Sequence, residues 1–175
     1  MPKNNVSVNT RRLAVLSLSV AFAMLLSYVE SITPPVVPLP GVKIGLANVA
    51  TVFVLASLGR RAALFVSVVR VLLISMLFGS PISAFYSLFG ALLSFGAMVL
   101  LLSFRQFSLI GVSVGGGVFH NVGQIIAASL ILGGREAFFY LPMLIISGVI
   151  AGIFVGAVSA FLLRRLNGYI NLNNI

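Results

Sequence analysis

Charged side chains are rare in this sequence, and one of them, Arg70, lies in the middle of the apolar stretch Ala62–Phe78. An arginine stays protonated in proteins, so inside an apolar environment it needs an anion or several carbonyl oxygens as partners. The chain has two acidic residues, Glu30 and Glu136, and neither is expected at the depth of Arg70. Two interpretations follow: a structural pairing of Arg70 with carbonyl groups or Glu30, and a counter-charge for an anionic ligand. We favour the second, because ionisable groups within a membrane usually mark function.

A second group of polar side chains lies within five residues of another apolar stretch, directly after three glycines at 115–117. His120 and Gln124 are one helical turn apart, and Asn121 and Gln124 are also neighbours on a helix surface. The glycines allow a backbone to bend or a ligand to approach closely. The cluster is either structural or part of a binding site, and these two interpretations stay open. A metal site is not expected, because the sequence has one histidine and no cysteine.

Lys43 and Asn48 complete the set of candidate binding residues. Lys43 precedes a short apolar stretch, and Asn48 follows about one turn later. A lysine at a helix end is usually an interfacial anchor, but together with Arg70, Arg135 and His120 it would make an outward-opening cavity positive. The sequence therefore predicts a small anionic or strongly hydrogen-bonding substrate. The candidate substrate-binding residues are Lys43, Asn48, Arg70, His120, Asn121 and Gln124.

The composition indicates where these side chains must be positioned. Of the 175 residues, 60% are hydrophobic and 7% are charged, against roughly 25% charged in an ordinary soluble domain. The mean hydropathy is +1.19 for a chain of 18.5 kDa, and a small soluble domain cannot hide that much apolar surface. The net charge of +9 would suggest nucleic acid in a soluble protein. Because these cations lie between apolar runs, we expect a multi-pass protein of the cell membrane, in contact with the lipid bilayer and not with nucleic acid.

The apolar runs predict an all-α membrane protein with six transmembrane helices. The expected segments are Leu13–Val29, Ile44–Leu58, Ala62–Phe78, Ser83–Phe104, Leu109–Leu132 and Phe139–Leu163. They form one transmembrane domain, 13–165, between tails at 1–12 and 166–175. Four prolines in Ser31–Val42 predict an extended segment on the outer face.

The basic residues predict the orientation of these helices. One side of a six-span arrangement carries Lys3, Arg11, Arg12, Arg60, Arg61, Arg105, Arg164 and Arg165. The opposite side receives Lys43 and Arg135. The positive-inside rule therefore places both termini, and with them both tails, in the cytoplasm.

Small residues at every fourth position predict close helix packing. The last segment carries Gly148, Gly152 and Gly156, a seam typical of packing within a bundle. The first segment carries two adjacent seams, which we expect to form one smooth face suited to a partner helix. They consist of Ser17 and Ala21, and of Ser19, Ala23 and Ser27.

Four motifs resemble one known family over nearly the whole chain. They are PGVKIGLAN from Pro40, RVLLISMLFG from Arg70, YSLFGALLS from Tyr86 and HNVGQ from His120. This sequence resembles the Gx transporter family, also labelled heptaprenyl diphosphate synthase component I, which is similar to the S components of energy-coupling factor (ECF) transporters. The resemblance implies a six-helix bundle with an outer substrate pocket. It also implies a transmembrane coupling subunit that contacts the first helix, here through Ser17, Ala21 and Ala23, and two partner ATPases.

From these features we expect the substrate-binding membrane subunit of an ECF-type ATP-driven importer. The substrate would be small and anionic, such as a quinone, isoprenoid or flavin-type precursor, between aromatic walls formed by Tyr28, Tyr86, Phe119 and Tyr140. We expect no directly bound cofactor, with ATP hydrolysed by the partner ATPases, since the chain has no GxxxxGK[ST] loop. The alternatives are a non-catalytic membrane subunit associated with heptaprenyl diphosphate synthase and a proton-coupled carrier using His120. An enzyme is not expected, because prenyl chain elongation needs aspartate-rich motifs and the chain has two acidic residues.

Overall fold

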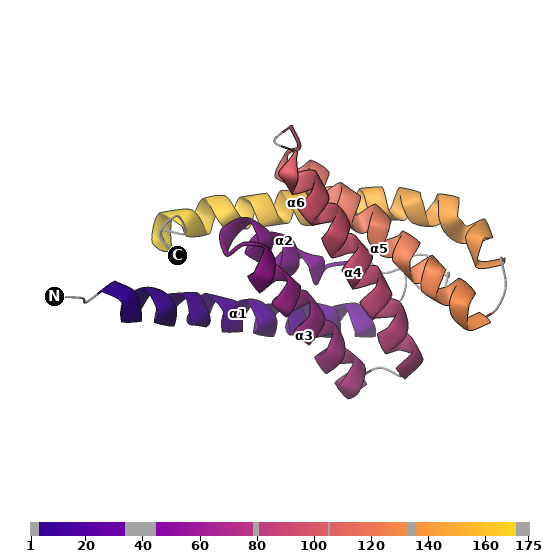
Figure 1. The fold of residues 1–175 in the computed structure, drawn as a ribbon, viewed down its shortest axis with the longest axis horizontal. Coiled ribbons are helices and arrows are strands. Elements are labelled where there is room, and N and C mark those ends of the chain that lie inside the picture. Colours follow the sequence, from indigo (N-terminus) through magenta and orange to yellow (C-terminus); the bar gives the residue numbers. More distant parts are fainter. Residues whose placement is uncertain (1–3, 34–44, 79–80, 105, 133–135, 171–175) are drawn as a thin grey trace.

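The computed structural model describes residues 4–33, 45–78, 81–104, 106–132 and 136–170 (Figure 1). Within these ranges the chain forms six α-helices and one short 3-10 helix, with no strand. The predicted all-α class is therefore confirmed. Lys43, Arg135 and residues 34–42 of the predicted extended segment lie outside the described residues.

Five of the helices are long and apolar enough to cross a membrane, which confirms the predicted multi-pass membrane protein. In chain order the helices are α1 (Asn4–Ile32), α2 (Asn48–Ser57), α3 (Arg60–Phe78), α4 (Pro81–Ser103), α5 (Leu109–Leu132) and α6 (Leu141–Ile170), with the 3-10 helix η1 (Glu136–Tyr140) before α6. α1 and α6 extend beyond the predicted apolar segments, so residues 4–12 and 166–170 of the predicted tails are helical.

α2 is shorter than the predicted segment Ile44–Leu58. Its 10 residues span about 15 Å, roughly half of the hydrocarbon thickness of a bilayer. Glycines with positive φ precede and follow it, Gly45 at 76° and Gly59 at 89°, and such backbone stops a helix from continuing. Seven consecutive residues of α2, from Val49 to Leu55, are buried. α2 is thus a short helix enclosed by the longer ones.

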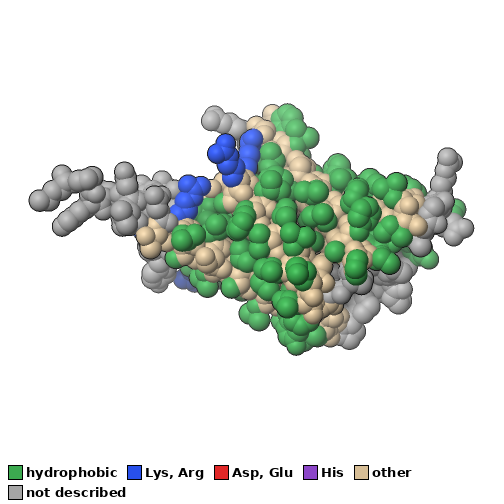
Figure 2. Space-filling view, turned by 60° about the horizontal axis from the view of Figure 1, so that its bottom comes forward, with side chains coloured by type: hydrophobic (Ala, Val, Ile, Leu, Met, Phe, Trp, Pro, Cys, Tyr) green, Lys and Arg blue, Asp and Glu red, His purple; other side chains and the backbone are tan. Residues whose placement is uncertain are grey.

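Basic residues from different helices meet at one end of the molecule. Arg12 donates a hydrogen bond from Nη2 to the Leu58 carbonyl oxygen at 3.3 Å, which joins α1 to the end of α2. Arg60 donates from Nη2 to Ser103 Oγ at 3.1 Å, which joins the start of α3 to the end of α4. The first turns of α1 and the last turns of α6 lie at this same end (Figure 1). Figure 2 shows the Lys and Arg side chains of one face gathered there, beside a mostly hydrophobic surface.

The glycine seam of α6 packs against α5, as predicted. A Cβ atom added at Gly152 would lie 2.5 Å from the Val114 Cα atom and 2.9 Å from the Ser113 carbonyl oxygen. A Cβ atom at Gly148 would lie 2.9 Å from the carbonyl carbon of Gly117. Real Cβ atoms do not approach a backbone this closely, so the two helices are in backbone contact. The seam therefore builds the bundle itself.

The two small-residue seams of α1 face different directions, so the prediction of one smooth face is wrong. Ser19, Ala23 and Ser27 are buried in the bundle, with exposed fractions of 7%, 0% and 8%, whereas Ser17 and Ala21 are exposed. The reason is geometric: residues two apart lie about 200° apart around a helix. Ala23 consequently does not belong to the surface that α1 offers to a partner.

Candidate functional site

Arg70 lies buried where α1, α2 and α3 meet, with 8% of the residue exposed. Its Nη1 donates to Ser27 Oγ at 3.5 Å and its Nη2 donates to Asn48 Oδ1 at 3.4 Å. Both distances exceed the usual range for such bonds, and among the described residues its Nε has no hydrogen-bond partner. The guanidinium is held in place by neutral oxygens and keeps unused hydrogen-bonding capacity.

The carboxylate of Glu30 has a different partner: its Oε1 accepts a hydrogen bond from the backbone N–H of Gly45. This contact fixes the end of α1 against the turn that leads into α2. A structural pairing of Arg70 thus runs mainly through Ser27 and Asn48. Glu30 and Arg70 nevertheless line the same cavity.

This cavity, the outer chamber, lies at the end of the bundle away from the clustered basic residues. It contains about 690 Å³ of empty space, part of it open to solvent. Five helices supply its polar lining: Ser27, Glu30 and Ser31 from α1, Asn48 from α2, Arg70 and Ser75 from α3, Ser87 from α4 and His120 from α5. The cavity thus holds two groups of opposite charge, and the Glu30 carboxylate is engaged by the Gly45 N–H. The Arg70 guanidinium, beside hydroxyl, amide and imidazole groups, suits a small ligand with an anionic end.

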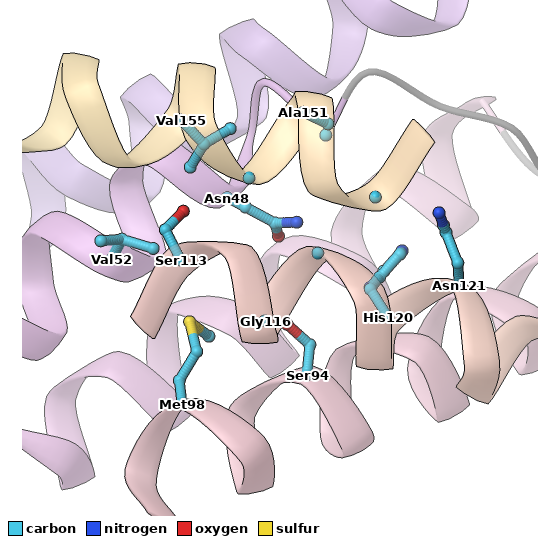
Figure 3. A pocket seen from close by; sticks show the side chains of 14 residues that line it. Asn48, Val52, Ser94, Met98, Ser113, Gly116, His120, Asn121, Ala151 and Val155 are labelled. Carbon is cyan, nitrogen blue, oxygen red and sulfur yellow. The ribbon is translucent and has the colours of Figure 1, made fainter. Parts of the chain in front are cut away.

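A second and much narrower cavity, the inner chamber, lies between α2, α4, α5 and α6 and has room for about one water molecule. Figure 3 shows Ser94 and Met98 of α4 pointing toward α5, and Asn121 of α5 pointing toward α6. The lining is rich in glycine, so backbone atoms rather than side chains form much of its surface. These glycines are Gly116, Gly117, Gly148 and Gly152. The polar lining consists of Asn48, Ser94, Ser113, His120 and Asn121.

Asn48 and His120 border both chambers, together with Gly45. His120 is placed by a glycine of the neighbouring helix: a Cβ atom at Gly90 would lie 2.9 Å from its Cε1 atom and 3.0 Å from its Nδ1 atom. The imidazole ring thus rests directly on the backbone of α4. Gly90 is the residue that gives the ring this position.

We expect Gly90→Ala to displace the His120 ring, because the added methyl group would overlap it. The chain has one histidine, so selective isotope labelling gives a single imidazole spin system whose chemical shifts report the displacement. Gly96→Ala on the same helix is the matched control, since a Cβ atom there meets nothing within 4 Å. Unchanged imidazole shifts in Gly90→Ala would contradict the close packing.

Asn121 and Gln124 do not share the position of His120 at the boundary between the two chambers. Asn121 donates from Nδ2 to the Leu144 carbonyl oxygen at 2.6 Å and to Ser147 Oγ at 3.2 Å, which fastens α5 to the start of α6. It also borders the inner chamber. Gln124 is 6% exposed and lies against α4, where its Cγ atom would be 3.0 Å from a Cβ atom at Gly90.

The structure therefore brings three of the six candidate binding residues to the outer chamber, Asn48, Arg70 and His120. Asn121 reaches only the inner chamber, and Gln124 is among the described lining residues of neither. Ser94 and Ser113 were missed by the sequence analysis. One signal was available: Ser113 precedes Gly117 by four residues, and Ser94 follows Gly90 by four, so each shares a helix face with a packing glycine.

The aromatic walls predicted from the sequence do not match the described lining. Tyr28, Phe119 and Tyr140 are 41%, 46% and 47% exposed, and together with the half-buried Tyr86 they border neither chamber. Tyr28, Phe119 and Tyr140 lie on the outer surface of the bundle. The described aromatic residue of the outer chamber is Phe78, whose ring lies 5.0 Å from that of Tyr28.

Comparisons with known proteins agree on the fold. The family model for heptaprenyl diphosphate synthase component I matches residues 19–162. A solved structure of the S component of a bacterial ECF transporter has a TM-score of 0.71 and 19% sequence identity, and the match covers 93% of this chain and 98% of that one. At this identity the likeness shows a shared fold. No curated protein matches the chain.

Proposed function

The chain belongs to the heptaprenyl diphosphate synthase component I family, and from this premise we propose that it is the substrate-binding membrane subunit of an ECF-type ATP-driven importer. Its substrate is a small anionic molecule such as a quinone, isoprenoid or flavin-type precursor. The observation that carries the proposal is Arg70, a buried cation that borders a cavity and has unused hydrogen-bonding capacity. The fold shared with an ECF S component supports it.

The arrangement of charges supports the orientation in the membrane that an importer requires. The described basic residues other than Arg70 lie at one end of the bundle, and the positive-inside rule places such an end in the cytoplasm. The outer chamber, at the opposite end, then opens to the outside, where an importer captures its substrate. ATP hydrolysis belongs to partner subunits, because the sequence has no phosphate-binding loop of the GxxxxGK[ST] kind.

The family description favours a second candidate, a non-catalytic membrane subunit associated with heptaprenyl diphosphate synthase. Chain elongation itself is not assigned to this protein, because it needs several aspartates to hold magnesium against a diphosphate. The two acidic residues of the sequence cannot supply them. Both candidates are therefore non-catalytic, and they differ in the partner that they require.

Purification of the tagged full-length chain from its host in mild detergent separates the two candidates. Mass spectrometry of the co-purifying proteins and small molecules is the readout. A membrane coupling subunit together with ATPases is the expected result. Recovery of a soluble prenyltransferase without them would overturn the importer proposal in favour of the synthase-associated subunit.

We propose that the coupling subunit contacts the exposed face of α1 around Ser17 and Ala21. Small residues allow close helix approach, so Ala21→Trp is expected to lower the recovery of the coupling subunit at least tenfold while ligand binding is unchanged. Ile150→Trp is the matched control, since Ile150 is also exposed to lipid, at 65%, on α6. Equal recovery from Ala21→Trp and wild type would show that the coupling subunit binds elsewhere.

A further inference from the structure

Two side chains of opposite charge line the outer chamber, Glu30 of α1 and Arg70 of α3. No described hydrogen bond joins them, because Arg70 donates to Ser27 and Asn48. Glu30, which is half-buried, accepts from the backbone N–H of Gly45 through Oε1. A carboxylate can accept several hydrogen bonds on its two oxygens, so Glu30 keeps acceptor capacity on Oε2.

The two charges lie at different depths of the chamber. On α1, Ser27 contacts Arg70, and Glu30 follows three residues later, about 4.5 Å farther along the helix axis. Before α2, Gly45 contacts Glu30 and lies one turn ahead of Asn48, which contacts Arg70. Two separate segments of the chain therefore place the carboxylate about one helical turn outward of the guanidinium.

A ligand with an anionic group alone is poorly matched to this arrangement. Its negative charge at Arg70 would lie about one helical turn from Glu30, and like charges repel each other. The ligand would also cover the carboxylate, and burying an ionised group without a partner is costly. A second ligand group that donates a hydrogen bond or carries a positive charge removes both costs. The empty space of about 690 Å³ lies within the range of small-molecule sites, about 300–1,000 Å³.

We propose that Glu30 is a second charged contact for the substrate and that the substrate is amphoteric. Its anionic group binds Arg70, and an ammonium or N–H group about one helical turn farther out binds Glu30. This inference rests on the proposed function and refines its substrate: of the classes named there, an isoprenoid chain has no such donor. Because the bond to Gly45 holds the carboxylate at the chamber, Glu30 both orders the turn before α2 and selects the ligand.

Thermal unfolding of the full-length protein in mild detergent tests this, because a ligand that binds the folded state raises the Tm with its concentration. At constant ionic strength we compare carboxylates in which an ammonium group is replaced by a methyl group. The pairs are 3-aminopropanoate and butanoate, 5-aminopentanoate and hexanoate, and 4-(aminomethyl)benzoate and 4-ethylbenzoate. In at least one pair the ammonium compound is expected to bind at least tenfold more tightly, as for a hydrogen bond between charged groups.

Glu30→Gln separates recognition of a charge from a structural role. Glutamine keeps an oxygen that can accept from the Gly45 N–H, but it carries no charge. We expect the preference for ammonium compounds to disappear, while the methyl-terminated acids bind as tightly as before or more tightly. A purely structural Glu30 would instead weaken both members of each pair equally.

Glu136→Gln is the matched control, because it makes the same change in the other acidic residue of the sequence. Glu136 begins η1, which packs on α5 and α6. The preference for ammonium compounds is expected to persist in this variant. The ranking of probes by the wild-type protein remains a test even where Glu30→Gln fails to fold.

Four outcomes would overturn the proposal. The first is a methyl-terminated acid that binds as tightly as its ammonium partner in every pair, and the second is a preference that Glu30→Gln leaves intact. The third is an equal loss of preference in Glu136→Gln, which would indicate a general effect of charge. The fourth is no binding of any probe, which would reject the ligand class. None of them affects the importer proposal, which depends on recovery of the coupling subunit and ATPases.

Discussion

Arg70→Met is expected to reduce affinity for the co-purifying ligand about 30-fold or more while the protein stays folded. Removing one partner of a buried, hydrogen-bonded charge pair costs about 2–5 kcal/mol of binding free energy, and every 1.4 kcal/mol is a factor of ten. In the proposed ligand complex Arg70 would provide the buried cation, and the described residues of the outer chamber contain no other Lys or Arg. Titration with the ligand identified from the wild-type purification gives the affinity.

The stability of Arg70→Met separates the two interpretations of this residue. Methionine fills a similar length with apolar atoms, and replacing a buried charge with a well-packed apolar group is often neutral or stabilising. The two hydrogen bonds that methionine cannot make are long, 3.5 Å to Ser27 and 3.4 Å to Asn48, so a ligand-binding arginine predicts an unchanged or higher Tm without ligand. A purely structural arginine predicts a lower Tm and normal ligand recovery, which would contradict the proposal.

Two further variants serve as controls for Arg70→Met. Arg61→Met removes a positive charge from the same helix at its exposed end and is expected to leave ligand affinity unchanged. Arg70→Lys keeps the charge but loses the planar fork that binds an anion through two parallel bonds. Its affinity is expected to lie between those of the wild type and Arg70→Met. An affinity loss in Arg61→Met equal to that in Arg70→Met would indicate a general effect of charge.

The sequence was sufficient to predict features that have a strong local signal. The cost of a charge within an apolar run made Arg70 recognisable as a candidate site residue. The long apolar segments predicted five of the six helices, and the bounds of α3, α4 and α5 agree to within two residues. The glycines of α6 predicted close packing, because fourfold spacing places them on one helix face. Each of these predictions depends on one segment of chain at a time.

Features that depend on several helices could not be predicted. Ser113 looks like any serine in a membrane helix, and only the packing of α2, α4 and α6 around it makes its hydroxyl buried and unpartnered. The bond from Ser159 to the Val49 carbonyl oxygen, 3.2 Å long, links residues 110 positions apart. Helix geometry alone was enough to predict that Ala23 and Ala21 face different directions. The sequence did not show which face of α1 the bundle covers.

Gly152→Ala is expected to destabilise the protein by about 1–3 kcal/mol, the usual cost of adding a methyl group to a well-packed core. The atoms that meet the new Cβ atom are backbone atoms, Val114 Cα at 2.5 Å and Ser113 O at 2.9 Å. Backbone cannot change rotamer, so relief requires α6 to move away from α5. The expected readout is a lower Tm in detergent and a lower free energy of unfolding.

The matched control for Gly152→Ala predicts a change of opposite sign. Gly96→Ala, on α4, adds the same methyl group where nothing lies within 4 Å, and a glycine in a helix interior costs up to about 1 kcal/mol relative to alanine. Gly96→Ala is therefore expected to stabilise the protein slightly. An unchanged stability of Gly152→Ala would mean that α5 and α6 pack more loosely than the backbone contact between them indicates.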